Sequence, residues 1–305
     1  MNNRQINLDP VTLGVALLLG LSVGVRDGSA QDFIPAGEPW PLQSLIVRGQ
    51  EPEGEGPETE PLEEEDHIET DRDSFTPATT TAGRRRSIIE AAYSLIDNRG
   101  AYDTHSFPES LLRYGLNDRV ELRLGWNYEV GGASSTVSGS DIGDVEPGVK
   151  IERASEISYG AKVGITEQDG WLPQSAFVAQ AFTPTSGPAT STDFVGTYVF
   201  GWELPDEWQL DAALRYGLTS EEHDHFNQWA PSVVLKVPVA DRWYAHVEYF
   251  GIATAGRERD RSVHYFSPGA HYLVTDNLEV GARFGWGLTQ DSANVFSNIG
   301  VGWRF

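Results

Sequence analysis

Cysteine is absent from this sequence of 305 residues. The chain therefore contains no disulfide, no thiolate metal cluster and no cysteine nucleophile. Positive charge is also scarce, because 22 Lys and Arg stand against 45 Asp and Glu and the formal net charge is -23. Binding a nucleic-acid backbone requires clustered cations, so this composition excludes a nucleic-acid partner.

Long apolar runs are scarce too, and the one that stands out is VTLGVALLLGLSVGV at residues 11–25. It is shorter than the about 20 residues that a membrane-spanning helix needs. Arg4 precedes it, and the small residues Gly28, Ser29 and Ala30 follow it. This pattern is typical of a secretory signal peptide, which we place at residues 1–30, so we expect the mature chain to be exported.

Residues 31–86 are rich in Pro, Glu, Thr and Gly, and residues 51–66 read EPEGEGPETEPLEEED. A segment with so much charge and so few large apolar side chains cannot bury enough surface to offset the entropy of ordering it. We therefore expect residues 31–86 to form a disordered acidic tether in the periplasm. The folded domain is expected at residues 87–305.

From residue 87 onward, apolar residues alternate strictly with polar or small residues. Three clear examples are VELRLGWNYEV at residues 120–130, WQLDAALRYGL at 208–218 and LEVGARFGWGL at 278–288. A period of two residues is the pattern of a β-strand with one apolar face and one polar face.

Soluble β-sandwiches also alternate, but three features favour a membrane barrel. The segments match the about 9–11 residues that a tilted strand needs to cross a bilayer. Aromatic residues lie near the ends of the apolar faces, and charges lie on the opposite faces, as in outer-membrane barrels. We predict an all-β fold, a transmembrane antiparallel up-and-down β-barrel surrounded by the outer-membrane lipids of a Gram-negative-type bacterium.

Connections of two lengths alternate along the predicted barrel, as expected for periplasmic turns and longer outer loops. The short ones are residues 117–119, 205–207, 240–242 and 275–277, and the long ones are 131–141, 185–193, 220–227, 255–261 and 289–293. Residues 141–166 keep their apolar positions on one parity, which favours a single long strand. The total is then about twelve strands, with fourteen as the alternative.

The last residues of the chain carry a more specific pattern. Ile299, Val301, Trp303 and Phe305 share one face of the final strand, and the chain ends on an aromatic residue. This end resembles the closing strand of bacterial outer-membrane barrels, which the barrel assembly machinery recognises. Trp303 and Phe305 are therefore the expected assembly signal.

Charged residues on the polar faces are the candidates for a selective lumen. We place Arg113, Arg123, Arg215, Arg283, Glu121, Glu248 and His246 there, together with Glu90, Glu129, Lys150, Lys162, Glu203, Asp211, Lys236 and Glu279. One interpretation is a constriction that selects solutes by charge or shape; the other is a set of mutual ion pairs that only packs the interior.

Three stretches resemble the outer-membrane family called putative MetA-pathway of phenol degradation. They are PESLLRYGLNDRVELRLGW at residues 108–126, GDVEPGVK at 143–150, and KVGITEQDGWLP followed by FTPTSG within 162–187. The resemblance covers most of residues 87–305. It implies a porin-like transport barrel grouped with importers of aromatic and other hydrophobic compounds, and it supplies no catalytic residues.

The predicted function is an outer-membrane channel or transporter for small solutes that are hydrophobic or aromatic. The alternatives are a structural envelope barrel without transport and an outer-membrane hydrolase. His246 and Glu248 share one strand face and His271 is a further candidate, but no serine is placed beside them as a nucleophile. The acidic and imidazole groups of residues 221–225 have no fixed spacing, so we expect no metal site, no cofactor and no enzyme activity.

Overall fold

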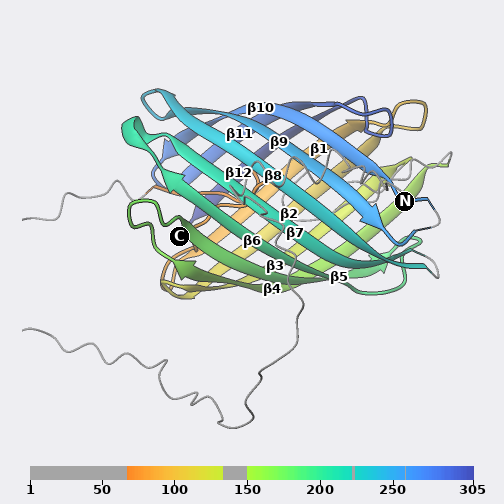
Figure 1. The fold of residues 1–305 in the computed structure, drawn as a ribbon, viewed down its shortest axis with the longest axis horizontal. Coiled ribbons are helices and arrows are strands. Elements are labelled where there is room, and N and C mark those ends of the chain that lie inside the picture. Colours follow the sequence, from red (N-terminus) through yellow and green to blue (C-terminus); the bar gives the residue numbers. More distant parts are fainter. Residues whose placement is uncertain (1–66, 133–149, 222–223, 258) are drawn as a thin grey trace, which may run out of the picture. The chain divides into compact units, whose positions relative to one another are not determined.

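The computed structural model describes residues 67–132, 150–221, 224–257 and 259–305 (Figure 1). Among these residues no helix is long and apolar enough to span a membrane. A single turn of 3-10 helix, η1 (Pro205–Glu207), connects two strands. The strands are β1 (Ser87–Asp97), β2 (Thr104–Asn117), β3 (Val120–Gly131), β4 (Glu152–Thr166), β5 (Gln174–Ser186), β6 (Asp193–Glu203), β7 (Gln209–Glu221), β8 (Asp224–Ala240), β9 (Trp243–Ala255), β10 (Ser262–Thr275), β11 (Leu278–Gly287) and β12 (Val295–Arg304).

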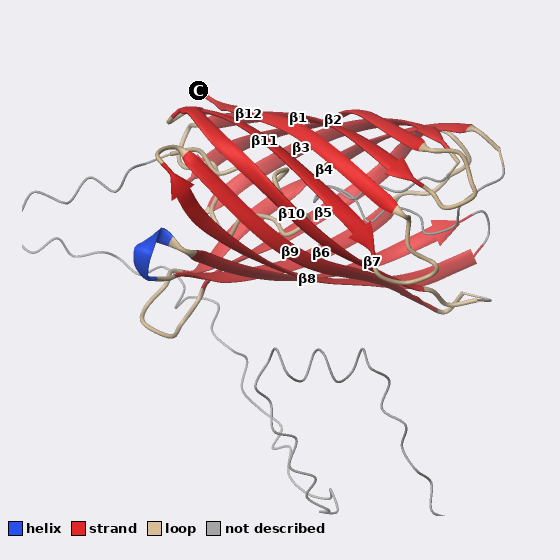
Figure 2. Cartoon of the chain, turned by 90° about the horizontal axis from the view of Figure 1, so that it is seen from above, coloured by secondary structure: helices blue, strands red, loops and turns tan. Residues whose placement is uncertain are grey.

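The twelve strands of the described residues form a closed barrel in which each strand pairs with its neighbours in sequence order. β1 closes the barrel on β12 in antiparallel register, from Ile88 opposite Arg304 to Asp97 opposite Val295. Figure 2 shows the strands inclined to the barrel axis, as closure of a sheet requires. The predicted antiparallel barrel of about twelve strands is confirmed.

In the described part of residues 141–166 the chain forms one strand, as predicted. β4 begins at Glu152 and pairs with β3 on one side and β5 on the other. Residues 133–149 lie outside the described residues. The fourteen-strand alternative has no counterpart in the described part of the chain.

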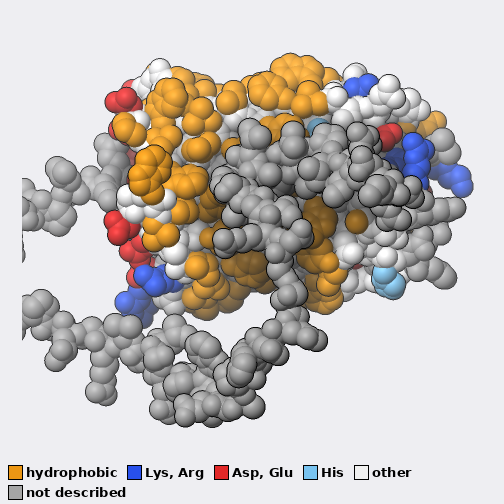
Figure 3. All heavy atoms as spheres, viewed as in Figure 1, with side chains coloured by type: hydrophobic (Ala, Val, Ile, Leu, Met, Phe, Trp, Pro, Cys, Tyr) orange, Lys and Arg blue, Asp and Glu red, His pale blue; other side chains and the backbone are white. Residues whose placement is uncertain are grey.

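The barrel wall has polar side chains inside and apolar side chains outside. On β3, Glu121 and Arg123 are 0% and 4% exposed, whereas Leu122 and Leu124 are 46% and 52% exposed. Figure 3 shows the same arrangement on one face, where apolar side chains cover the wall and charged side chains gather near its two ends. A wall whose large apolar residues face outward is suited to lipid.

The two ends of the barrel differ in their connections. Turns of two residues at 118–119, 241–242 and 276–277 lie at one end, which we call the short-turn end, together with residues 167–173 and η1. The other end, the long-loop end, carries residues 98–103, 187–192, 256–261 and 288–294. The C-terminal residue Phe305 lies at the short-turn end (Figure 2).

One predicted long connection is wrong. β7 continues to Glu221 and β8 begins at Asp224, so the predicted loop at residues 220–227 is a tight hairpin. Residues 220–227 suggested a loop because apolar and polar residues do not alternate there. A strand that extends beyond the lipid has water on both faces, so alternation is no longer required there.

The N-terminal boundary of the ordered region also differs from the prediction. Residues 67–86, which we call the lumen segment, enter the barrel, and most of their side chains are buried, whereas Arg84, Arg85 and Arg86 are exposed. Part of the expected disordered tether is therefore ordered, because charged side chains of the barrel wall bind residues such as Asp71 and Thr76. The predicted signal peptide at residues 1–30 and residues 31–66 of the tether lie outside the described residues.

Candidate functional site

The lumen segment spans the interior of the barrel. Arg72 forms an ion pair with Glu109 on β2, while Thr76 on the same segment donates a hydrogen bond to Glu248 on β9. β2 and β9 are far apart in the strand order of the barrel. A segment that contacts both is a plug within the lumen rather than a strap along one wall.

The first group of contacts centres on Asp71 of the lumen segment. Its carboxylate lies 3.6 Å from Nη1 of Arg113, 2.6 Å from Nη1 of Arg123 and 3.1 Å from Nζ of Lys162. These cations come from β2, β3 and β4. We call these four residues, with Glu90 and Glu121, the arginine cluster.

The arginine cluster is balanced in charge. Nε of Arg113 is 3.0 Å from Glu121, and Nη1 of Arg113 is 3.1 Å from Glu90. Arg123 also reaches Glu121, at 2.8 Å. Three cations therefore face three carboxylates, and every one of these side chains is buried. Buried charges are tolerated only when they are paired in this way.

Electrostatics holds Asp71 in its charged form. Burial by itself would raise the pKa of the Asp71 carboxyl, but the charges of Arg113, Lys162 and Arg123 outweigh it and hold the pKa well below its usual range. Asp71 is thus an ionised link between the lumen segment and three neighbouring strands.

A second group of contacts surrounds Phe75 of the lumen segment. The Phe75 ring stacks on Phe250 of β9 with 4.3 Å between centroids and 10° between planes. The guanidinium of Arg215 lies over the other side of the ring, 4.1 Å from its centroid, and donates a hydrogen bond to the Phe75 carbonyl. The ring is therefore held between an aromatic face and a cation.

Glu248 fixes the backbone on which Phe75 is carried. The backbone N–H groups of Phe75 and Thr76 donate to its two carboxylate oxygens at 2.9 and 2.7 Å. Arg283 of β11 donates to the same carboxylate at 2.9 Å. The Glu248 carboxylate therefore accepts hydrogen bonds both from a cation of the wall and from backbone amides of the lumen segment.

The lumen has two regions of different character. Toward the long-loop end, its wall is apolar, and Phe75 packs into that apolar region. The buried residues of this apolar region are Phe75, Ile96, Phe182, Val195, Ala230, Phe250, Ile252, Val263, Tyr265 and Phe296. Toward the short-turn end, the wall carries the charged side chains described above.

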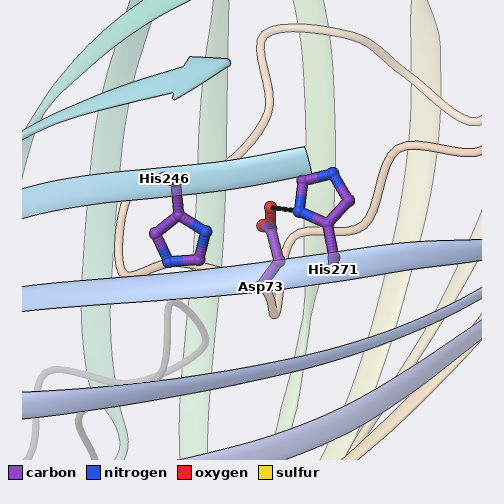
Figure 4. A group of neighbouring side chains, drawn as sticks. All are labelled: Asp73, His246 and His271. Carbon is purple, nitrogen blue, oxygen red and sulfur yellow. Dashed lines mark ion pairs between the residues drawn. The ribbon is translucent and has the colours of Figure 1, made fainter. Parts of the chain in front are cut away.

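A third group of contacts joins Asp73 to two histidines. Figure 4 shows the Asp73 carboxylate between the rings of His246 on β9 and His271 on β10. Nδ1 of His271 is 3.7 Å from Asp73, and Nζ of Lys236 is 3.4 Å from it. We call Asp73, His246 and His271 the histidine cluster.

The seven lumen candidates named first in the sequence analysis are all buried in the interior. They divide among the three groups: Arg113, Arg123 and Glu121 lie in the arginine cluster, Arg215, Arg283 and Glu248 around Phe75, and His246 in the histidine cluster. Two further charged residues are not in the lumen, because Lys150 and Glu203 are exposed near strand ends.

The residues of the expected assembly signal lie outside the barrel. Trp303 and Phe305 are 52% and 57% exposed, and their ring centroids are 5.0 Å apart. The backbone of Phe305 exchanges two hydrogen bonds with Ser87, each of 2.9 Å, where β12 meets β1. The aromatic end of the chain is thus part of the seam of the barrel.

Sequence reasoning missed Asp71, Asp73 and Phe75. They lie in residues 67–86, which follow the acidic run ending at Asp66 and contain few further acids. The drop in acidic residues after Asp66 and the presence of Phe75 were the features that could have indicated an ordered segment here. Their wall partners are more than 20 residues away in most cases, so no local period could reveal them.

This chain is similar to proteins of known structure. The crystal structure of the COG4313 outer membrane channel from Pseudomonas putida F1 is similar over 74% of this chain and 98% of that chain, with 12% identity and a TM-score of 0.53. The NanC porin is similar over 71% of this chain and 98% of that chain, with 7% identity and a TM-score of 0.49. No curated protein matches the sequence. The family model described as "Putative MetA-pathway of phenol degradation" matches residues 70–305, and the chain belongs to that family.

Proposed function

We propose that this protein is an outer-membrane channel for small solutes that carry an aromatic or similarly flat apolar group. The lumen segment occupies its pathway and controls entry. The short-turn end faces the periplasm, from which residues 31–66 lead to the lumen segment. Outer-membrane lipids surround the wall, and the barrel assembly machinery acts on the end that carries Trp303 and Phe305.

The position of Phe75 carries this proposal. The chain places one of its own aromatic rings in the apolar region of the lumen, between the Phe250 ring and the Arg215 guanidinium. A solute with an aromatic ring can make the same stacking and cation–π contacts when Phe75 moves away. The site is thus complementary to aromatic solutes before any solute is bound.

The charged lumen supplies a second basis for selection. Arg113, Arg215 and Arg283 are all buried in the wall and directed inward. If the lumen segment withdraws, Arg113 loses Asp71 and Arg215 loses the Phe75 carbonyl. The arginines then face the pathway, where they favour solutes with a negative group. A small aromatic anion combines both requirements.

The arrangement of the histidines favours a channel over a hydrolase. Ser267 is buried in the lumen, but its hydroxyl has no hydrogen-bond partner, and neither ring nitrogen of His246 has one. A serine nucleophile requires a base within hydrogen-bond reach. Single-channel conductance distinguishes the proposed channel from the other alternative, a structural barrel without transport.

Uptake into liposomes tests the proposal. Benzenesulfonate and cyclohexanesulfonate have the same charge and similar size, and both cross lipid poorly. We expect Phe75→Ala to raise the uptake of both anions, because it empties the site between Phe250 and Arg215. We expect Phe250→Leu to remove the preference for the aromatic anion.

Phe266→Ala is the matched control, because Phe266 lies on the outer face of β10 and is 40% exposed. It should leave uptake unchanged. Absence of uptake and of single-channel conductance in both the wild type and Phe75→Ala would reject the channel and favour the structural barrel.

A further inference from the structure

The histidine cluster is arranged as a set of metal ligands. One donor atom from each of Asp73, His246 and His271 lies within 4.8 Å of the other two. Donors around a tetrahedral zinc ion at about 2.0–2.1 Å are roughly 3.3 Å apart. Small side-chain rotations are therefore enough to bring the three donors onto one ion (Figure 4).

The two ring nitrogens of His246 are buried without hydrogen-bond partners among the described residues. The residue is 3% exposed, and both Nδ1 and Nε2 lack a hydrogen-bond partner in the described structure. A buried polar group without a partner costs free energy, so its retention indicates a ligand that the protein chain itself does not supply. Gly269 on β10 leaves the room for this ring, because a side chain at that position would collide with it.

We propose that Asp73, His246 and His271 bind a divalent transition-metal ion of the zinc type. Two imidazoles and one carboxylate form a ligand set that zinc sites commonly use, with water in the fourth position. Glu279 is a nearby alternative fourth ligand, since its carboxylate is 4.0 Å from Nε2 of His271. The site is distinct from the stacking site of Phe75 and does not depend on the identity of the solute.

The charges around the histidine cluster allow a cation to enter. Lys236 and Arg283 are the positive groups near Asp73, and Lys236 is the closer, at 3.4 Å. Arg283 already has its own partner in Glu248. Lys236 can turn to the buried carboxylate of Asp211, which interacts with it electrostatically. A metal ion would thus replace Lys236 at Asp73 without leaving the lysine unpaired.

A cavity borders one of the three proposed ligands. A small cavity lies against the wall formed by β11 and β12, and its lining includes Thr70, Asp73, Glu279 and Asn298. The cavity thus borders Asp73, which is the ligand contributed by the lumen segment, and Glu279, which is the alternative fourth ligand.

Metal binding would join the lumen segment to the wall. Asp73 belongs to the segment, whereas His246 and His271 belong to β9 and β10. The ion would therefore stabilise the plugged state and not a state in which the segment has left. Loss of the ion would favour release of the segment.

The test is a zinc titration of the purified full-length protein after treatment with EDTA, followed by calorimetry and metal analysis. We expect one zinc ion per chain. His246→Ala, His271→Ala and Asp73→Asn should each lower the affinity by at least the about 10- to 100-fold that loss of an outer-shell partner costs. Cobalt(II) in place of zinc should give the visible absorption of a four-coordinate site, and this absorption should disappear in the same variants.

His264→Ala is the matched control, because His264 also lies on β10 but on the outer face, where Nδ1 is 2.7 Å from the Tyr249 hydroxyl. It should bind zinc as the wild type does. Each variant is first checked for the folded barrel by its faster migration on gels without boiling. The proposal is overturned if the wild type binds no stoichiometric zinc, or if folded His246→Ala and Asp73→Asn bind it unchanged.

Discussion

Arg113 illustrates how single residues determine the character of the lumen. Its guanidinium reaches Asp71, Glu90 and Glu121, which lie on the lumen segment and on two strands. The side chain is completely buried, so water cannot replace these partners. The residue therefore acts both as a candidate for selectivity and as a connection within the interior.

Arg113→Gln should be strongly destabilising. It leaves three carboxylates with less positive charge in a buried site, and breaking a buried ion pair costs about 3–5 kcal/mol. The measurement is the urea midpoint of unfolding in detergent. Arg119→Gln is the control, because Arg119 pairs with Glu167 at 2.7 Å on the surface, where both side chains are mostly exposed. Its loss should cost less than about 1 kcal/mol, and equal effects of the two substitutions would contradict the role of Arg113.

Deletion of Phe305 should lower the amount of folded barrel in cells. It removes two hydrogen bonds to Ser87 at the seam and an exposed aromatic ring at the end of β12. Phe305→Tyr retains the backbone pairing and an aromatic ring, so its yield should remain near that of the wild type. The readout is the heat-modifiable fraction in outer-membrane preparations. Equal yields of the deletion and the wild type would argue against Phe305 as an assembly signal.

At the scale of elements, the strands followed directly from the sequence. β3 and β11 begin at the predicted residues, Val120 and Leu278, and β7 begins one residue after the predicted start at 208. Each of these strands has lipid on one face and the lumen on the other, so their residues must alternate. β4 begins at Glu152 and not near residue 141, and β7 and β8 continue into the loop predicted at residues 220–227.

The lumen segment could not be predicted by the same reasoning. It has no strand or helix of its own in residues 67–86, and it is ordered by charges on strands that are distant in sequence. Its composition therefore resembles that of a flexible tether. The seven lumen residues were placed on the correct face, but Asp71 and Phe75, which bring them together, were outside the predicted domain. The family match beginning at residue 70 includes both.

A disulfide between the lumen segment and the wall should lock the channel. The hydroxyls of Thr76 and Ser232 are 2.9 Å apart, so cysteines at both positions are close enough to be bridged with small adjustments. Because the natural chain has no cysteine, the pair forms without competing thiols. We expect Thr76→Cys/Ser232→Cys to show low conductance when oxidised and wild-type conductance after reduction. Each single cysteine variant is the control, and a locked protein that conducts as the wild type does would exclude movement of the segment as the gate.

At the scale of the whole molecule, the two ends of the barrel define a direction. The proposed orientation places residues 256–261 outside the cell and the short-turn end in the periplasm. Trypsin added to intact cells should therefore cut near Arg257, Arg259 or Arg261 and spare residues 31–86. The fragments are identified by mass spectrometry, with permeabilised cells as the control. Cleavage within residues 31–86 on intact cells would reverse the orientation.

The position of the lumen segment has a consequence for how the barrel is made. The segment continues directly into β1, and β1 is one of the two strands that meet at the seam. Asp71 contacts cations of β2, β3 and β4, and these contacts do not involve β12. We infer that the sheet assembles around the lumen segment, which neutralises the inward-facing cations of these three strands before the seam closes.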